Sequence, residues 1–430
     1  MEGRPLRGMR DYLGEEAILR SELLEKIKAS FELFGFQPLE TPALESWDVL
    51  SAKGAGGEEI LEETYNFTDK AGRRIGLRYD LTVPLARVVA SNPTLPLPYK
   101  RYQIGKVWRY GEVGKGRLRE FTQCDIDIIG SEHMISDAEV ITCAVHTLKN
   151  IGIDNFIVRL NNRKLLNSLV RLAGVPEEMT IDVLRAIDKI DKIELNGVIA
   201  ELKKLDLTHN TLNSIVEFLK IRGKPSEVLT SAKDIVKGDK EGEEGVEELN
   251  KLLHNLKLMG SYEVITIDLS LARGLDYYTG PIFEFVALEG VGSITSGGRY
   301  DNLIKIFSGK QIPATGISLG LERIIEVLKE TKEQKPKKTK TQTYIAATND
   351  EVRDSVIEVA TLLRQRGIKT DYDLKIRKLT RQLEYAASIN VAYVIIVGKE
   401  ELSRGAVKLR NMQTWEEKEV QIEQLHLYIK

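Results

Sequence analysis

Residues 107–127 read VWRYGEVGKGRLREFTQCDID, and this run is the most informative about the fold. Two strand-like halves flank a glycine-rich turn, a pattern that predicts an antiparallel hairpin more than a βαβ unit. A second β-rich run broken by glycine covers residues 64–78. Together the two runs predict a domain built on an antiparallel sheet.

The side chains near the base of this hairpin suit a small polar ligand. Arg109 carries a planar fork of donors that can grip a phosphate, and Phe121 offers a surface on which a base can stack. Gln123 and Asp127 are four residues apart, so on a strand they project to the same side. Taken alone, the pattern is more typical of an ordinary hairpin with a charged solvent face.

Two later runs combine glycine with polar side chains. Residues 271–280 read LARGLDYYTG, and Arg273 stands there beside a glycine that lets a ligand approach the backbone. Tyr277 and Tyr278 supply two hydroxyls, although paired tyrosines more often pack in a core or at its rim. Residues 295–301 read TSGGRYD, whose double glycine permits either a tight turn or a close approach to a ligand.

Residues 316–325, GISLGLERII, predict a strand that enters a helix. Arg323 lies in the first turn of that helix, where a guanidinium beside unpaired N–H groups suits a polyphosphate. An isolated arginine is more often found on an exposed helix face. Residues 77–82, LRYDLT, contain an Asp-x-Thr that alone indicates a strand end or a cap.

In their order along the chain, these runs resemble the class II aminoacyl-tRNA synthetases. Residues 107–127 are similar to motif 2 of that class, residues 316–325 to motif 3, and Thr41-Pro42 to motif 1, where the class places its dimer interface. Residues 271–280 resemble a signature confined to the histidyl-tRNA synthetases and their close relatives, and residues 295–301 resemble a histidine-pocket segment of that family.

The resemblance implies a role for each matching residue. Cationic and aromatic side chains would bind ATP: Arg109 and Arg273, the catalytic pair, at the α-phosphate, Arg323 at the terminal phosphate and Phe121 on adenine. The amino-acid end of histidine would be held by Asp80, Thr82, Gln123 and Tyr277. The imidazole would be bound by Asp127 and Tyr278, and a pocket of such polar groups discriminates strongly between substrates.

The resemblance also implies the reaction. Histidine would be activated with ATP to histidyl-adenylate and pyrophosphate, and then transferred to the 3′ end of tRNA(His). Alignment of the reactants and cationic stabilisation would supply the catalysis, without a protein nucleophile. Mg²⁺ would be bound on the ATP phosphates and not by a cluster of side chains, and Arg273 would take over part of a metal's role. A homodimer is expected.

The sequence departs from the class pattern in two places. In most members an acid stands two places after the motif 2 arginine, whereas here that position is Gly111 and the acid is Glu112. Glu112 is therefore the candidate for the ATP contact that this acid makes. Asp80 and Asp127 stand where bacterial members commonly carry Glu, which predicts the archaeal and eukaryotic branch.

The pattern of apolar and polar residues along the chain predicts five segments. Sheet signals occupy residues 1–160 and return in residues 256–330, and the helical spacing of residues 161–255 between them predicts an insertion. Residues 331–342 read as an exposed polar linker, and residues 343–430 alternate strands and helices. The expected fold is an α+β catalytic domain of the class II type, a helical insertion and an α/β domain that resembles an anticodon-binding domain.

Composition narrows the class of protein. A chain of 430 residues with 42% hydrophobic residues can bury a sizeable core. Its net charge of −2 argues against a general nucleic-acid coat or a membrane-surface protein, so any RNA contact must be local. The two cysteines and five histidines lack metal-ligand spacing. Without a signal peptide or a membrane-spanning run, the expected compartment is the cytoplasm, with no membrane partner.

Two other classes of protein share this fold. One is the regulatory subunit that partners ATP phosphoribosyltransferase, but such proteins usually lack the anticodon-binding domain and have eroded motifs. The other is a sensor or polymerase-accessory relative that only binds nucleic acid. The three arginines Arg109, Arg273 and Arg323 argue for the enzyme.

Overall fold

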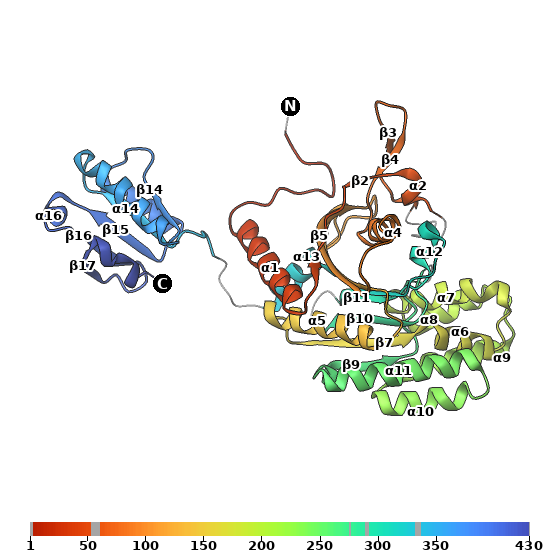
Figure 1. The fold of residues 1–430 in the computed structure, drawn as a ribbon. Helices are drawn as coiled ribbons and strands as arrows, with labels where there is room; N and C mark the ends of the chain where they lie inside the picture. The colour runs from red at the N-terminus through yellow and green to blue at the C-terminus, as the bar shows by residue number, and fades with distance from the viewer. Residues whose placement is uncertain (1–2, 53–60, 275–276, 289–291, 332–336, 430) are drawn as a thin grey trace. The chain divides into compact units, whose positions relative to one another are not determined.

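The computed structural model describes residues 3–52, 61–274, 277–288, 292–331 and 337–429. It contains two compact units, which Figure 1 follows along the chain. The first unit comprises Met1–Arg10 and Leu24–Lys332, and the second comprises Asp11–Leu23 and Glu333–Lys430. Asp276 of the 271–280 run and residues 332–336 of the expected linker lie outside the described residues.

Nine strands of the described residues form the central sheet of the first unit, in the order β1-β5-β6-β12-β11-β10-β7-β9-β8. Their bounds are β1 Gln37–Pro38, β5 Tyr99–Trp108, β6 Glu120–Ile129, β7 Phe156–Asn162, β8 Arg222–Gly223, β9 Ile265–Asp268, β10 Pro281–Ala287, β11 Ser293–Arg299 and β12 Ala314–Gly320. The centre of the sheet is antiparallel, as predicted. The pairs β1–β5 and β7–β9 are parallel, because long crossovers join those strands, so the sheet is mixed.

The predicted hairpin of residues 107–127 is confirmed as the β5–β6 pair, which is continuous from Trp108–Glu120 to Tyr99–Ile129. Side chains alternate across β6. One set faces the helix α5, which spans Ile135–Ile151, and is apolar or small: Cys124, Ile126 and Ile128. The other set is polar and faces the opposite side: Gln123, Asp125 and Asp127. The sequence therefore gives this sheet one apolar face and one polar face.

Shorter elements surround this sheet. The predicted opening helix is α1, Gly14–Leu33, and its side chains Ile27 and Phe31 are fully buried. A small sheet contains β2 Leu44–Ser46, β3 Asn66–Thr68 and β4 Arg74–Leu77. The remaining helices of this part are α2 Trp47–Leu50, α4 Thr82–Ser91, α12 Leu303–Ser308 and α13 Leu321–Thr331.

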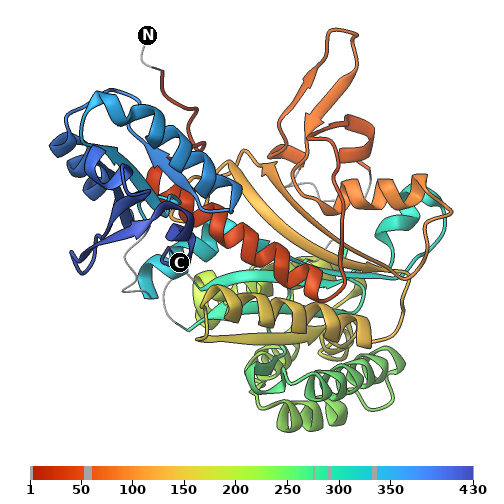
Figure 2. The same ribbon diagram turned by 60° about the vertical axis from the view of Figure 1, so that its left-hand side comes forward.

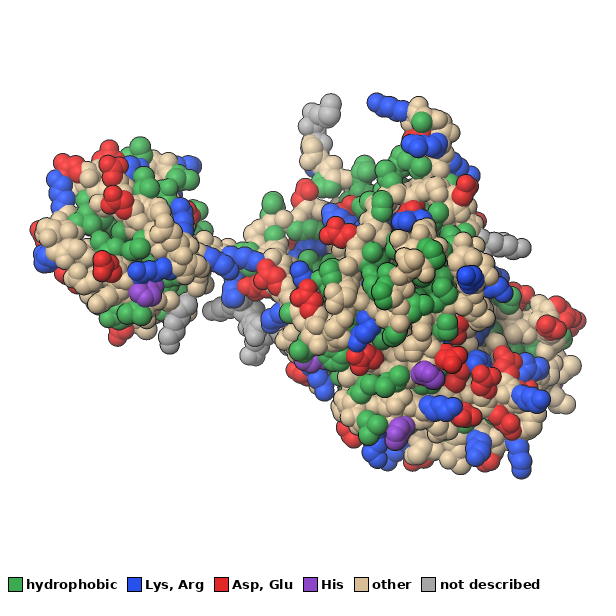
Figure 3. All heavy atoms as spheres, in the orientation of Figure 1, with side chains coloured by type: hydrophobic (Ala, Val, Ile, Leu, Met, Phe, Trp, Pro, Cys, Tyr) green, Lys and Arg blue, Asp and Glu red, His purple; other side chains and the backbone are tan. Residues whose placement is uncertain are grey.

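A helical segment interrupts the sheet between β7 and β9, and Figures 1 and 2 show its helices gathered beside that part of the sheet. It contains α6 Arg163–Leu172, the short helix Glu177–Met179, α7 Thr180–Asp188, α8 Ile190–Leu202, α9 His209–Leu219, α10 Pro225–Ile235 and α11 Lys240–Leu258. A second short helix, Tyr262–Val264, precedes β9. In Figure 3, acidic and basic side chains are interspersed over these helices. Any RNA contact here would therefore be local.

The second unit contains a five-stranded sheet in the order β14-β13-β15-β16-β17. Its elements are β13 Thr343–Ala347, α14 Arg353–Gln365, β14 Thr370–Tyr372, α15 Leu379–Ser388, β15 Tyr393–Val397, α16 Lys399–Leu402, β16 Ala406–Asn411 and β17 Glu417–Gln421, with short helices at Asp350–Val352 and Ile422–Leu427. Successive residues of β13 enter different cores: Tyr344 packs near Ala386 of α15, and Ile345 packs near Val359 of α14. Among the described residues, no helix is both long and apolar enough to span a bilayer.

Candidate active site

A cavity of about 1280 Å³ opens on the polar face of the central sheet. It is lined from both parts of the interrupted first unit. Ten of the expected site residues line it: Asp80, Thr82, Arg109, Phe121, Gln123, Asp127, Arg273, Tyr277, Tyr278 and Arg323. Glu112 is exposed in the hairpin turn and is not among the lining residues. Its expected ATP contact stays a prediction.

Strand register explains how distant residues meet in this cavity. Asp127 pairs with Arg101 of β5 on one side and with Gly316 of β12 on the other, and Gly316 pairs with Gly298 of β11. Paired residues of adjacent strands share a face of the sheet. Asp127 and Gly316 of this row line the cavity, and two members of the row, Gly316 and Gly298, have no side chain.

Gly316 and Gly298 cannot be replaced without a clash. A Cβ on Gly316 would lie 1.9 Å from Oδ1 of Asp127, and a Cβ on Gly298 would lie 2.9 Å from the ring of Tyr278. The double glycine 297–298 is thus within β11 and not in a turn. The expected tight turn is therefore wrong, and the close approach to a ligand stays a prediction. The ring of Tyr278 occupies the space that a Cβ on Gly298 would need.

Asp127 has a partner for each of its carboxylate oxygens. Nη2 of Arg101 lies 2.6 Å from Oδ2, and the hydroxyl of Tyr300 donates to Oδ1. All three side chains are buried. Burial raises the pKa of Asp127, and the charge of Arg101 opposes that rise. Asp127 therefore lines the cavity as a carboxylate whose charge is largely compensated by Arg101.

Asp80 lies at the start of α4, at another part of the cavity wall. Its Oδ1 accepts from the backbone N–H of Val83 at 3.0 Å, so it caps the helix as its sequence context indicated. Burial raises its pKa to about 6, while the hydrogen bond to Val83 and the charge of Arg109 oppose the rise. Thr82, the first residue of α4, lines the same cavity.

The two adjacent tyrosines form one aromatic wall. The ring centroids of Tyr277 and Tyr278 are 4.5 Å apart, and the hydroxyl of Tyr277 donates to that of Tyr278 at 3.4 Å. The ring of Tyr300 meets Tyr277 edge-on at 6.3 Å. Burial raises the pKa of Tyr277 to about 12 and also raises that of Tyr278. Both phenols therefore remain protonated and can donate hydrogen bonds at neutral pH.

Three arginines line the cavity: Arg109, Arg273 and Arg323. Nε of Arg109 donates to the carbonyl of Tyr79 at 2.9 Å, and its guanidinium lies 5.4 Å from the ring centroid of Phe121. Arg323 donates to the carbonyl of Ser293 at 2.6 Å. Burial lowers the pKa of Arg323, and the charges of Arg117 and Arg273 lower it further. Positive charges this close to one another favour an anionic ligand.

Arg273 is bound by carboxylates from two parts of the chain. Its Nη2 lies 3.2 Å from Glu284 of β10 and 3.5 Å from Asp191, and its Nη1 lies 3.5 Å from Asp188. Asp188 ends α7 and Asp191 lies in the first turn of α8. Glu284 is 1% exposed and is also paired with Arg159 at 3.1 Å. These pairs fix the guanidinium at the cavity edge.

Sequence reasoning missed several residues of this site. Glu284 stands within the apolar strand PIFEFVA, and a lone acid in such a strand is a signal for a buried ion pair. Asp125 lines the cavity and lies midway between Gln123 and Asp127, so the two-residue period of a strand would have included it. Tyr300 belongs to the 295–301 run, which resembles a histidine-pocket segment, but no role was expected for this residue. Arg101 carries no comparable signal, because its role depends on the pairing of separate strands.

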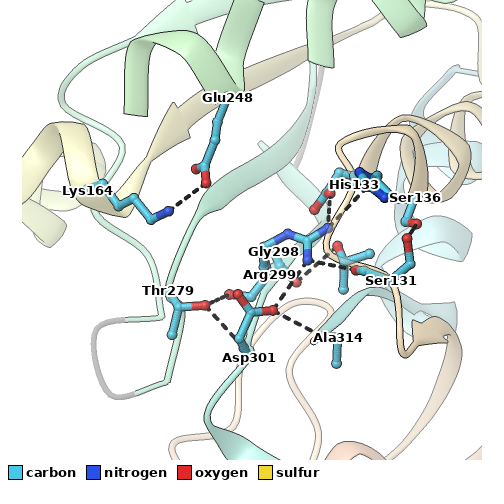
Figure 4. Close-up of polar contacts among 12 residues, drawn as sticks. Ser131, His133, Ser136, Lys164, Glu248, Thr279, Gly298, Arg299, Asp301 and Ala314 are labelled. Carbon is cyan, nitrogen blue, oxygen red and sulfur yellow. Dashed lines mark hydrogen bonds and ion pairs between the residues drawn. The ribbon is translucent and has the colours of Figure 1, made fainter. Parts of the chain in front are cut away.

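Arg299 of the 295–301 run does not line the cavity, but it holds neighbouring segments of the chain together. It is paired with Asp137 of α5, and its Nη1 donates to the carbonyl of Ser131 at 3.0 Å. Asp301 accepts from Arg299 at 3.3 Å and from the backbone N–H of Ala314 at 3.1 Å. Figure 4 shows these contacts linking β11, β12 and the segment before α5. Arg299 therefore fixes the position of Tyr300, which does line the cavity.

Comparisons with known proteins agree with the geometry. Residues 8–324 match a family model described as histidyl-tRNA synthetase, and residues 342–430 match one described as an anticodon binding domain. The histidine–tRNA ligase of Aeropyrum pernix is 42% identical, covering 94% of this chain and 93% of that protein. The enzyme of Pyrococcus furiosus is 38% identical over 99% and 98%, and one from Bacillus cereus is 38% identical over the whole of both chains.

Solved structures give the same result for the fold. The crystal structure of histidyl-tRNA synthetase from a Nostoc species has a TM-score of 0.89 and 30% identity, with 100% of each chain covered. A Bacillus halodurans structure described as an ATP phosphoribosyltransferase regulatory subunit/histidyl-tRNA synthetase has a TM-score of 0.78 at 23% identity, covering 92% of this chain and 98% of that one. At that identity the second likeness concerns the fold alone.

Proposed function

The chain belongs to the histidyl-tRNA synthetase family, and from this membership we propose how its cavity carries out the reaction of a histidine–tRNA ligase. It is an aminoacyl-tRNA synthetase, with ATP, histidine and tRNA as its substrates. The observation that carries the proposal is that ten residues scattered from position 80 to position 323 line one cavity. The regulatory-subunit alternative is not favoured, because the anticodon-binding domain is present.

The cationic side of the cavity is proposed to bind ATP. Arg109 and Arg273 contact the α-phosphate, Arg323 contacts the terminal phosphate, and adenine stacks on Phe121. A carboxylate oxygen of histidine then attacks the α-phosphorus, and the bond to the leaving pyrophosphate breaks. The arginines lower the barrier by holding the reactants in line and by stabilising the charge that develops on the phosphate oxygens.

A neighbouring part of the cavity is proposed to bind histidine. Asp80, Thr82, Gln123 and Tyr277 hold its amino-acid end, and Asp127 and Tyr278 contact its imidazole. An amino acid without the ring nitrogens would leave buried polar groups unpaired, which is why such a pocket selects against it. In the second step the terminal hydroxyl of tRNA(His) attacks the histidyl carbonyl and AMP leaves.

Mg²⁺ is proposed to enter on the ATP phosphates. Among the described residues, no cluster of three or more His, Cys, Asp or Glu side chains could hold a metal ion. Glu284, the most buried acid near the phosphate side, is already bound to Arg159 and Arg273. The phosphates of ATP would therefore be the main ligands of Mg²⁺, with few or no ligands from the protein. This is the usual mode of Mg²⁺ binding to nucleotides.

The domain bounds stay part of the proposal: catalytic residues 1–160 and 256–330, an insertion at 161–255, a linker at 331–342 and an anticodon-binding domain at 343–430. The archaeal and eukaryotic branch also stays a prediction, since the identity to the Bacillus cereus enzyme equals that to the Pyrococcus furiosus enzyme. A cytoplasmic location is proposed because protein synthesis takes place there.

Purified protein is expected to catalyse ATP–pyrophosphate exchange that depends on histidine and on none of the other standard amino acids. Exchange with labelled pyrophosphate measures the first step, and acid-precipitable labelled histidine on tRNA(His) measures the second. Chelation of Mg²⁺ by EDTA should stop both steps. Exchange driven equally by several amino acids, with the protein folded, would show that the histidine pocket is wrongly assigned.

A homodimer is proposed from the resemblance of Thr41-Pro42 to motif 1. Sedimentation equilibrium of the full chain at micromolar concentration is expected to give twice the mass of 48.4 kDa. A mass of one chain across that concentration range would remove the dimer from the proposal.

A further inference from the structure

Asp125 is a buried carboxylate that lines the cavity and has no role in the reaction described above. It is 2% exposed and lies on β6, one step in the strand period from Gln123 and from Asp127. Across the sheet it pairs with Gln103 of β5 and with Ser318 of β12. Its position is therefore central on the polar face of the sheet.

Two acceptors at this position lack donors. Oδ1 of Asp125 and Oε1 of Gln123 are buried, and neither has a hydrogen-bond partner among the described residues. Nε2 of Gln123 donates to Oγ of Ser318 at 2.6 Å, which holds the amide in place. A buried acceptor without a donor costs free energy, and that of a carboxylate costs the most. A ligand that brings N–H donors removes this cost.

Asp125 lies among charges of both signs. Its neighbour Asp127 is paired with Arg101, so that arginine is already engaged by one carboxylate. Asp80 and Asp127 both raise the pKa of Asp125, and Arg101 lowers it, although burial has the largest effect. Arg78 and Asp125 also attract each other, and Arg109 lowers the pKa of Asp80, so arginines and carboxylates are mixed on this side of the cavity.

We propose that Asp125 is a further substrate-binding residue, whose free carboxylate oxygen accepts, together with Oε1 of Gln123, hydrogen bonds from the α-ammonium group of histidine. The inference rests on the proposed histidine site. An ammonium group carries three donors and is positively charged at neutral pH, whereas a neutral imidazole carries one donor and no charge. Two buried unpaired acceptors on neighbouring side chains of one sheet face, one of them a carboxylate oxygen, fit the ammonium group.

The test is Asp125→Asn, which keeps the shape of the side chain and removes its charge. Calorimetric titration of the full chain compares three probes: histidine, histidinol and 3-(imidazol-4-yl)propanoate. Histidine and histidinol have the ammonium group, and the propanoate has the imidazole without it. The variant is expected to bind histidine and histidinol about 10- to 100-fold more weakly, since a hydrogen bond to a charged group is lost. Binding of the propanoate should change by less than about twofold.

Glu120→Gln on the same strand is the matched control. Its carboxylate already accepts from Lys106 at 2.6 Å and from Trp108 at 2.9 Å, and it does not line the cavity. This variant should bind all three probes as the wild type does. If Asp125→Asn fails to fold, judged by circular dichroism, Asp125→Ser replaces it and must show the same pattern of affinities.

The possible results separate the inference from the site assignment. Equal weakening for all three probes would place Asp125 at the imidazole and overturn the inference, as would unchanged binding of all three. Wild-type protein that binds the propanoate and no ammonium probe would contradict it as well. Wild-type protein that binds none of the three would instead contradict the proposed histidine site.

Discussion

Arg273→Ala is expected to lower histidine-dependent ATP–pyrophosphate exchange by about a thousandfold, the effect of removing a donor that stabilises transition-state charge. Of the proposed phosphate ligands, this guanidinium has the most carboxylate partners, with Glu284, Asp188 and Asp191 within 3.5 Å. Its geometry is therefore fixed before ATP arrives, and preorganised charge of this kind acts mainly on the transition state.

The fold should survive this substitution. Asp188 and Asp191 are partly exposed, so each loses a pair worth at most about 1 kcal/mol. The buried Glu284 keeps its second partner, Arg159. Arg171→Ala on α6 is the control, because it also removes an arginine with two acidic partners, here Asp239 and Glu241, without touching the cavity. Unchanged exchange in Arg273→Ala, with normal exchange in the control, would exclude Arg273 from the mechanism.

Arg101→Met is expected to lower the free energy of unfolding by about 3–5 kcal/mol, because it leaves a buried carboxylate without its counter-charge. Arg101 is fully buried and its Nη2 lies 2.6 Å from Oδ2 of Asp127. Equilibrium denaturation in urea measures the change. The double variant Arg101→Met with Asp127→Asn should recover much of the loss, since the uncompensated charge is gone.

Lys100→Met is the matched control on the neighbouring position of β5. Lys100 is partly exposed and pairs with Glu139 at 2.7 Å, so its loss should cost no more than about 1 kcal/mol. A similar loss of unfolding free energy in both variants would show that the buried pair Arg101–Asp127 is no more important for stability than the exposed pair Lys100–Glu139.

The defect of Arg101→Met should also depend on pH. Burial already raises the pKa of Asp127, and the loss of Arg101 removes the main effect that opposes this. An acid whose pKa is higher in the folded state binds more protons when folded, so stability falls as pH rises. The deficit relative to wild type should accordingly be larger at pH 8 than at pH 5.

The sequence was informative where a local pattern determines the structure. The alternation and glycine-rich turn of residues 107–127 predicted the β5–β6 hairpin, and the helical spacing predicted α1, α14 and α15. The order of the runs identified the family and most of the cavity lining. These features depend on residues that are close together in the sequence, so they can be recognised from local patterns.

The sequence was uninformative where strands far apart meet. The parallel pairs β1–β5 and β7–β9 follow from chain crossovers that no local pattern reveals. Asp125 and Asp127 look alike in the sequence, yet only Asp127 faces Arg101 and Tyr300 in the structure. Which of the two acids is compensated is decided by the register of β5 against β6, and register depends on the whole sheet.

Gly316 and Gly298 also limit how the enzyme can be redesigned. At Gly316 any side chain would collide with Asp127, and at Gly298 with Tyr278. The shape of the pocket at these positions is therefore set by the main chain and cannot be changed by small side-chain substitutions. An engineer who wants a bulkier or differently shaped amino acid must begin at the walls, with Tyr277, Tyr278 or Asp127 itself. The same restriction applies in evolution, because any single substitution of these two glycines introduces a clash with a residue of the pocket.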